Sequence, residues 1–268
     1  MREMTMPKQL LNNITYHSDT CNKHVKPTKM MIIDDVPVCP KCELEKEQEK
    51  FNESVQQEIR QAMLNKKYNT LDKHSILQDN TLLDATLDNY IAKEQEEITN
   101  KNTVIEAVDR MKNGQIFNVV LQGNQGSGKS HLAYAALKEL NDQDTSCLFA
   151  NVESVLRLIK DSFNNKESKY SENYFVDLMS KVDYLVLDDI GAETGAIGTD
   201  KAATDFVQRI LYAITTTRQD KSTFITTNLS SQTLFNMYDK KLVSRLFKNP
   251  KFIIFKETQD KRMSNIPF

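Results

Sequence analysis

The sequence predicts an α/β protein built on a mostly parallel sheet that is flanked by helices on both faces. From about residue 80 onward, short apolar segments alternate with segments of helical periodicity, and parallel strands require such helical crossovers. In addition, three of the seven glycines in this 268-residue chain lie together in "GNQGSG" (123–128), between an apolar segment and a helical one. Glycine is costly to order, so the cluster indicates that the backbone must approach something closely.

Five segments have the length and composition of buried strands. Each is short, apolar and rich in residues that favour β structure. They are 116–123, 146–151, 182–189, 222–228 and 251–255. The segments between them repeat their apolar residues with helical spacing, which predicts helices at 130–141, 152–163, 200–218 and 231–247.

Composition divides the chain into three expected parts. Residues 1–43 hold three of the four cysteines and four of the six prolines, and we expect a small N-terminal domain there. Residues 44–80 are polar and contain no glycine or proline, which predicts a helical linker. Residues 81–268 carry the alternating strands and helices and are expected to form the main domain.

One apolar stripe runs along the predicted linker helix. Phe51, Val55, Ile59 and Ala62 follow one another at spacings of four, four and three residues, so they share one helix face. Such a stripe either packs on the chain's own domain or binds a partner protein. The first interpretation is the more ordinary one.

The glycine cluster has the pattern of a phosphate-binding loop. Residues 123–130 match G-x-x-x-x-G-K-[ST] at every specified position, after an expected strand and before an expected helix. The backbone N–H groups of such a loop, and the positive end of the next helix, bind a phosphate chain. Lys129 is expected to reach the β- and γ-phosphates of ATP, and Ser130 to ligate Mg²⁺. The positions expected to line the nucleotide are Gly123, Asn124, Gln125, Gly126, Ser127, Gly128, Lys129, Ser130 and His131, with no chemical role for His131.

Two further strand ends carry polar side chains suited to hydrolysis. "YLVLDDIG" (184–191) places two carboxylates after a buried strand. Asp188 is expected to hold the Mg²⁺, and Asp189 to orient or deprotonate the attacking water. "FITTN" (224–228) ends in Asn228, a candidate for positioning that water. The alternative for these residues is ordinary polarity at a strand end.

In this order, the phosphate loop, the strand with two aspartates and the strand with asparagine resemble the AAA+ ATPases. "LQGNQGSGKSHLA", "LVLDDIGAE" and "FITTNLS" are similar in particular to bacterial helicase loaders of the DnaC/DnaI type. The resemblance covers roughly residues 80–262. The related transposition-helper ATPases share much of the pattern and remain an alternative.

The resemblance implies roles for several further residues. Asn228 corresponds to the family's sensor 1. "LVSRLF" (242–247) is similar to the segment that carries the arginine finger, so Arg245 would face the γ-phosphate bound by a neighbouring subunit. Arg262 corresponds to sensor 2, and Arg218 to a basic position for which a structural role is expected.

Two positions depart from the family's pattern. A glycine that is common before the C-terminal basic residue is replaced at or next to Glu257, which weakens the assignment of Arg262. Asp189 stands where many AAA+ enzymes have glutamate, and the shorter side chain is compatible with slow hydrolysis.

The N-terminal cysteines have the spacing of a zinc site. Cys21-x₂-His24 and Cys39-x₂-Cys42 supply four ligands that can surround one tetrahedral ion, with His17 as a possible substitute for His24. A segment this short buries little core, so a metal would supply stability. A redox Cys-x-x-Cys pair and unrelated surface thiols are the alternatives. In the loaders that the chain resembles, an N-terminal domain, zinc-binding in some, contacts the replicative helicase.

Composition limits the partners and the compartment. The net charge of −2 and the pI near 6.1 exclude a bulk polycation, so contacts with nucleic acid must be local. Residues 164–175 are the local candidate for contact with single-stranded DNA, although a polar loop is the more ordinary interpretation. There is no apolar run of membrane-spanning length and no hydrophobic signal core, and we expect a cytoplasmic protein without a membrane partner.

The leading hypothesis is therefore an ATP-dependent loader of the hexameric replicative helicase. It would use ATP/ADP, Mg²⁺ and Zn²⁺, dock on the helicase through its N-terminal domain, contact single-stranded DNA, and self-assemble through its AAA+ module. A transposition-helper ATPase is the first alternative. A nucleotide-gated adaptor with negligible hydrolysis is the second, and a small-molecule P-loop kinase is a distant third.

Overall fold

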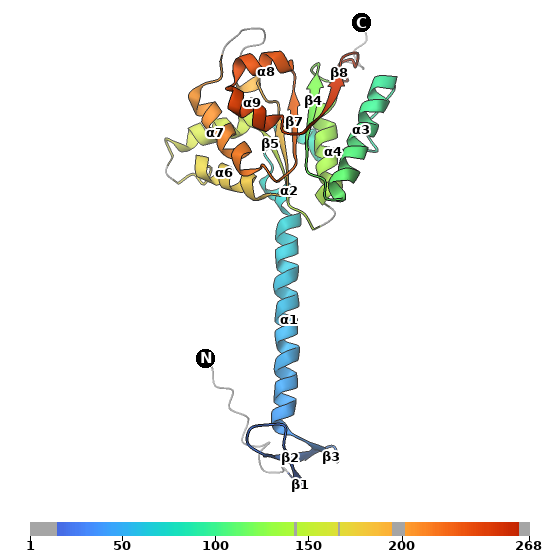
Figure 1. Cartoon of the computed structure of the whole chain (residues 1–268), viewed down its shortest axis with the longest axis vertical. Coiled ribbons are helices and arrows are strands. Elements are labelled where there is room, and N and C mark those ends of the chain that lie inside the picture. Colours follow the sequence, from blue (N-terminus) through green and yellow to red (C-terminus); the bar gives the residue numbers. More distant parts are fainter. Residues whose placement is uncertain (1–14, 142–143, 166, 195–201, 263–268) are drawn as a thin grey trace. The chain divides into compact units, whose positions relative to one another are not determined.

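The computed structural model describes residues 15–141, 144–165, 167–194 and 202–262. The chain divides into two compact units, Met1–Met63 and Leu64–Phe268. Each unit is described by itself below, with its elements labelled as in Figure 1.

The first unit contains a small antiparallel sheet in the order β1-β2-β3, followed by helix α1. The bounds are β1 (Tyr16–Cys21), β2 (Thr28–Ile33), β3 (Val36–Val38) and α1 (Pro40–Tyr68). Asp34 and Asp35 both have positive φ and connect β2 to β3, as two-residue hairpin turns require. The sequence analysis predicts none of these three short strands. The helical linker expected at 44–80 corresponds to α1, which begins earlier, at Pro40, and ends at Tyr68.

The apolar stripe of α1 is exposed. Phe51 is 67% exposed and Ile59 51%, and no described residue of α1 is buried. The stripe therefore adds nothing to a hydrophobic core in this structure. Although α1 is long, neither it nor any other helix in the described part of the chain has an apolar stretch able to cross a membrane.

The second unit carries the predicted alternation of strands and helices. Its elements are α2 (Thr70–His74), η2 (Asn80–Asp84), α3 (Gln95–Lys112), β4 (Asn118–Gly123), α4 (Lys129–Asn141), β5 (Cys147–Asn151), α5 (Val152–Ser162), α6 (Glu172–Lys181), β6 (Tyr184–Asp188), η3 (Ala192–Thr194), α7 (Asp205–Thr217), β7 (Thr223–Thr227), α8 (Ser231–Met237), α9 (Lys240–Leu246) and β8 (Pro250–Phe255). All five expected strands are confirmed, each within two residues at either end.

These five strands form one parallel sheet in the order β5-β6-β7-β4-β8. The central position of β4 follows from its composition, because a strand flanked on both sides must be apolar on both faces. Val119, Val120 and Leu121 are each fully buried. Because all strands point the same way, their carboxyl ends share one edge of the sheet.

Helices cover the two faces of the sheet, as the sequence predicts (Figure 1). Alternate residues of each strand point to opposite faces, so Val119 and Leu121 pack with α3 and α4, whereas Val120 packs with α5 to α9. The sheet thus separates two hydrophobic cores, and both contribute to holding the strands in register.

Two expected helices differ from the structure. The helix expected at 200–218 begins only at Asp205, because Thr204 is extended and its hydroxyl accepts the N–H of Val207 as an N-cap. Its first expected residues, 200 and 201, lie outside the described part. The helix expected at 231–247 is two helices, because Tyr238 is extended and Asp239 caps α9.

The segment 164–175, which was expected to be a polar loop or a contact for single-stranded DNA, is only in part a loop. Residue 166 lies outside the described part. The last four residues of the segment form the first turn of α6, and Tyr170, Tyr174 and Phe175 pack against one another and against the α5–α9 core. These rings contribute to the fold, so they are poor candidates for stacking on nucleic-acid bases.

Arg218 joins the amino-terminal ends of two central strands. It is 5% exposed and donates to the carbonyls of Met179, Val182, Asp183 and Ser222 at 2.7–3.1 Å. Burial lowers the pKa of its guanidinium to about 10, which leaves it charged at neutral pH. This geometry is compatible with the structural role expected for Arg218, because one side chain satisfies four backbone carbonyls.

We expect Arg218→Met to destabilise the second unit by about 3 kcal/mol or more, because it removes donors from several buried carbonyls at once. Urea unfolding of the full chain measures this loss. Arg209→Met is the matched control: Arg209 forms an ion pair with Glu172 at 2.7 Å on the surface, so its loss should destabilise the unit much less. Equal losses in the two variants would contradict the structural role of Arg218.

Candidate functional site

A cavity of about 820 Å³ lies at the carboxyl edge of the parallel sheet. We call it the P-loop cavity, because the loop contributes Gln125, Gly126 and residues 128–131 to its wall. Asp189, Asn228 and Arg262 also line it. The structure therefore brings together four separate parts of the sequence that were each expected near a nucleotide.

The backbone of the loop requires glycine at two positions in particular. Gly126 and Gly128 have φ of +73° and +88°, which side-chain-bearing residues rarely adopt. A Cβ atom on Gly126 would lie 1.8 Å from the carboxylate of Asp260, and one on Gly128 would lie 2.6 Å from the ring of Tyr90. The glycine cluster thus permits both the curl of the loop and the close packing of its neighbours.

The amine of Lys129 lies inside the loop. It donates to the carbonyls of Gly123 at 3.0 Å and Asn124 at 2.7 Å, and to the hydroxyl of Ser127 at 3.4 Å. Burial lowers its pKa to about 8, although the carboxylates of Asp188 and Asp189 act in the opposite direction. A phosphate chain in the loop would offer this buried ammonium a far stronger acceptor than neutral carbonyls.

The two aspartates at the end of β6 differ in burial and in backbone conformation: Asp188 is buried, whereas Asp189 is half-buried. Asp188 ends the strand; its carboxylate accepts a hydrogen bond from Thr226 at 2.8 Å and lies 3.4 Å from the amide of Asn151. Asp189 has φ of +57°, which turns the chain out of the sheet direction and places this residue in the cavity wall. Burial raises the pKa of both carboxyls, and with the nearby Asp188 that of Asp189 reaches about 6.

Asn228, His131 and Arg262 also line the cavity, whereas Gly123, Asn124 and Ser127, which were expected to line the nucleotide, are not part of its wall. Asn228 follows β7 and is exposed to the cavity. His131 shares a hydrogen bond with the carbonyl of Thr86 at 3.0 Å, so it ties α4 to the segment before α3. Arg262 lines the cavity, with its backbone N–H donating to Asp260 at 2.9 Å.

Arg245 does not belong to the P-loop cavity of its own chain. Its guanidinium lies 4.4 Å from the ring of Tyr212, and it lines a second cavity of about 290 Å³. Ile116 and Asn118, at the start of β4, line the same second cavity, which therefore lies at the amino edge of the sheet. Among the contacts of the described residues, none joins Arg245 to the phosphate loop of its own chain.

One side of the cavity was not expected from the sequence: it is formed by Tyr90, the start of α3 and the segment after β8. Tyr90 donates its hydroxyl hydrogen to the carbonyl of Ser127 at 3.1 Å. Glu96 accepts the backbone N–H groups of residues 256–258 at 3.0–3.1 Å, and Glu97 forms a 2.7 Å ion pair with Lys261. Glu94 and Glu97 form a capping box at the start of α3, but Glu94 is not the usual capping residue, so the sequence carries no signal for it, and nothing in the sequence pairs Glu97 with the C-terminal segment.

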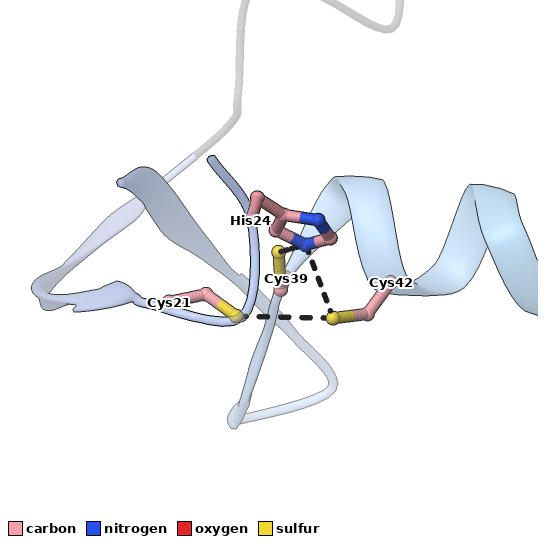
Figure 2. Close-up of side chains that lie close together, drawn as sticks. All are labelled: Cys21, His24, Cys39 and Cys42. Atoms are coloured by element: carbon pink, nitrogen blue, oxygen red, sulfur yellow. Dashed lines mark hydrogen bonds between the residues drawn. The ribbon is translucent and has the colours of Figure 1, made fainter. Parts of the chain in front are cut away.

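The four residues expected to bind zinc converge in the first unit (Figure 2). The sulfurs of Cys21 and Cys42 are 3.8 Å apart, and Nε2 of His24 lies 3.4 Å from the sulfur of Cys39 and 3.3 Å from that of Cys42. In a tetrahedral zinc site with Zn–S distances of about 2.3 Å, ligand sulfurs are about 3.8 Å apart. His17 lies outside this cluster and is paired with Asp19.

Two details of the cluster suit a metal site. Nδ1 of His24 lies 3.4 Å from the carboxylate of Glu45, and such a partner leaves Nε2 free to bind metal. Burial raises the pKa of the Cys39 thiol, but hydrogen bonds from the Cys42 backbone and from His24 outweigh it and bring the pKa to about 6. Zinc binds the thiolate form, so the donor set and its geometry fit this ion.

Solved structures confirm the fold of the second unit. The crystal structure of the DnaC helicase loader superposes with a TM-score of 0.54 at 22% identity, covering 66% of this chain and 100% of that one. The crystal structure of DnaI gives 0.54 at 21% identity, covering 67% and 95%. A putative primosome component from Streptococcus pyogenes serotype M3 gives 0.52 at 20% identity, covering 67% and 90%.

Curated relatives support the expected resemblance at the level of sequence. The replicative helicase loader DnaC of Escherichia coli (strain K12) is 38% identical over 81 residues, which are 30% of this chain and 32% of that protein. DnaC of Buchnera aphidicola subsp. Schizaphis graminum (strain Sg) is 26% identical over 134 residues, 50% and 52% of the two chains. The chain thus spans about a third to a half of the length of these relatives.

A protein-family model matches a longer stretch of the chain than the DnaC of Escherichia coli does. The model described as "IstB-like ATP binding protein" matches residues 105–247, which run from α3 through the phosphate loop and the acidic pair to the end of α9. Since the match extends over more than half of the 268 residues, the chain belongs to the family of IstB-like ATP binding proteins.

Proposed function

We propose that this chain is an ATP-dependent loader that places a hexameric replicative helicase on single-stranded DNA during the initiation of replication in the cytoplasm. The observation that carries the proposal is the convergence of the phosphate loop, Asp189 and Asn228 on one cavity, with Asp188 directly before Asp189 in the chain. The curated relatives matched by the chain, which are named replicative helicase loaders, supply the cellular role.

The P-loop cavity suits ATP hydrolysis through a division of roles. The loop N–H groups and Lys129 would hold the triphosphate, and Ser130 and Asp188 would hold Mg²⁺, which would offset the negative charge of the phosphates. Asp189 accepts a proton from the attacking water or orients it, a task that suits a carboxyl whose pKa is raised toward neutrality. Asn228 and Arg262 complete the cavity wall where the γ-phosphate and the water would lie.

Assembly of several copies would give Arg245 its role. This arginine lies at the sheet edge opposite its own phosphate loop, and a role at a neighbouring chain's nucleotide is compatible with that position. Hydrolysis would then depend on self-assembly through the second unit. ATP would hold one assembly state, and its hydrolysis would release the helicase.

The first unit is proposed as the zinc-stabilised part that docks on the helicase. Cys21, His24, Cys39 and Cys42 would hold the ion, which would be structural because four protein ligands leave no open position. A nucleotide-gated adaptor without significant hydrolysis is the second candidate. The aspartate at position 189, shorter than the glutamate of many AAA+ enzymes, is the observation that favours it.

Substitution at Asp189 separates these two candidates. We expect Asp189→Asn to lower the rate of ATP hydrolysis by about 100-fold or more, because an amide cannot accept the proton, while ATP binding persists. Turnover and ATP affinity of the full chain are measured in parallel. Asp177→Asn, an exposed carboxylate on α6 paired with Lys181, is the control and should behave like the wild type. Unchanged turnover in Asp189→Asn would favour the adaptor.

Metal analysis tests the first unit. The full chain should contain one Zn²⁺, and His24→Ala should lose it, whereas His17→Ala should keep it because His17 lies outside the cluster. Glu45→Gln should weaken zinc binding by about 10-fold, since it removes the partner that orients His24. Elemental analysis and competition with a chelator give these values. Full zinc content in His24→Ala would refute the assignment.

Co-purification with a replicative helicase tests the proposed cellular role. The full chain should form a stable complex with the helicase, and His24→Ala should lose this complex if the zinc unit is the docking part. Lys129→Ala should bind the helicase but fail to release it with ATP. Lys138→Ala, on the same helix, is the control and should both bind the helicase and release it with ATP. A complex with a transposase and none with a helicase would identify a transposition helper instead.

A further inference from the structure

Thr226 is a buried polar residue in the middle of the sheet that no role above explains. It lies in β7, opposite Leu121 of β4, and it is fully inaccessible to solvent. Valine has nearly the same shape as threonine and has no polar side-chain group that needs a hydrogen-bond partner. A hydroxyl at such a site loses its hydration, so its presence calls for partners inside the protein.

The hydroxyl of Thr226 contacts both members of the acidic pair. It donates to Oδ1 of Asp188 at 2.8 Å and accepts the backbone N–H of Asp189, also at 2.8 Å. The carbonyl of Thr226 accepts the N–H of Ile190 at 2.9 Å. A single residue of the neighbouring strand therefore holds three consecutive residues at the end of β6.

These contacts determine where the two carboxylates point. The bond to Oδ1 limits rotation of the Asp188 side chain and leaves its other oxygen near Asn151. The bond to the N–H of Asp189 satisfies a group at the residue whose φ of +57° is unfavourable for a non-glycine residue, by of order 1 kcal/mol. That conformation brings Asp189 into the cavity wall, so the hydroxyl supports it directly.

Thr226 itself does not reach the nucleotide. It is absent from the wall of the P-loop cavity, which Asp189 and Asn228 line. We propose that Thr226 is a positioning residue for ATP hydrolysis, whose hydroxyl orients Asp188 toward Mg²⁺ and fixes the backbone turn that presents Asp189 to the attacking water. The inference rests on the proposed ATPase function and assigns to β7 a second contribution to the site besides Asn228.

The test compares Thr226→Val, which removes only the hydroxyl, with Thr226→Ser, which keeps it. In the full chain, Thr226→Val should lower kcat by about 10- to 100-fold, the usual effect of losing a residue that orients a metal ligand. KM for ATP should stay within about 2-fold, because the phosphate-loop contacts are unchanged. Thr226→Ser should restore most of kcat. A loss of stability alone would not lower kcat in the folded variant while leaving KM unchanged.

A second measurement does not depend on turnover. Mg²⁺ should strengthen ATP binding to the wild type. Thr226→Val should reduce this enhancement by about 10-fold, whereas Thr226→Ser should retain it. Thr215→Val is the matched control, because Thr215 is a buried threonine of α7 whose hydroxyl bonds only to carbonyls of its own helix. Both its kcat and its Mg²⁺ enhancement should equal those of the wild type.

Wild-type kcat and Mg²⁺ enhancement in a folded Thr226→Val variant would overturn the positioning role. The positioning role would also be overturned if Thr226→Ser were impaired as strongly as Thr226→Val. If the wild type binds ATP but does not hydrolyse it, the proposed ATPase function fails instead, and the Mg²⁺ enhancement alone then decides the role of Thr226.

Discussion

Parallel pairing of β6, β7 and β4 is the constraint on which the candidate site depends. Because β7 lies between the other two and all three run in the same direction, the phosphate loop, the acidic pair and Asn228 emerge at one edge of the sheet. The register is fixed by packing on both faces, since a slip of one residue would exchange the side chains of the two cores. Function and hydrophobic packing therefore depend on the same alignment.

The two edges of the sheet use buried polar groups in opposite ways. At the amino edge, Arg218 gives its donors to carbonyls of the surrounding chain, which satisfies that part of the fold. At the carboxyl edge, Lys129 is buried and its amine donates to carbonyls of its own loop, which a phosphate chain could replace as acceptors. Burial alone does not identify a functional residue; the nature of its present partners is the better guide.

The two units obtain their stability from different sources. The second unit buries two hydrophobic cores on either side of its sheet. Among the described residues of the first unit, Cys39 alone is buried. A unit with so little apolar burial needs another source of folding free energy, and the proposed zinc ion would supply it by joining the ends of β1 and β3 to the start of α1.

The sequence by itself determined the class of the fold, the five strands, the phosphate loop and the four residues of the cysteine–histidine cluster, because each depends on local spacing or on composition. It did not indicate α3, the division between α8 and α9, or the side of the cavity built from Tyr90, Glu96 and Glu97. Nor did it assign Thr226, whose significance lies in a hydroxyl shared with two residues 37 and 38 positions earlier. Such contacts join segments that are distant in the chain, so only the tertiary structure decides them.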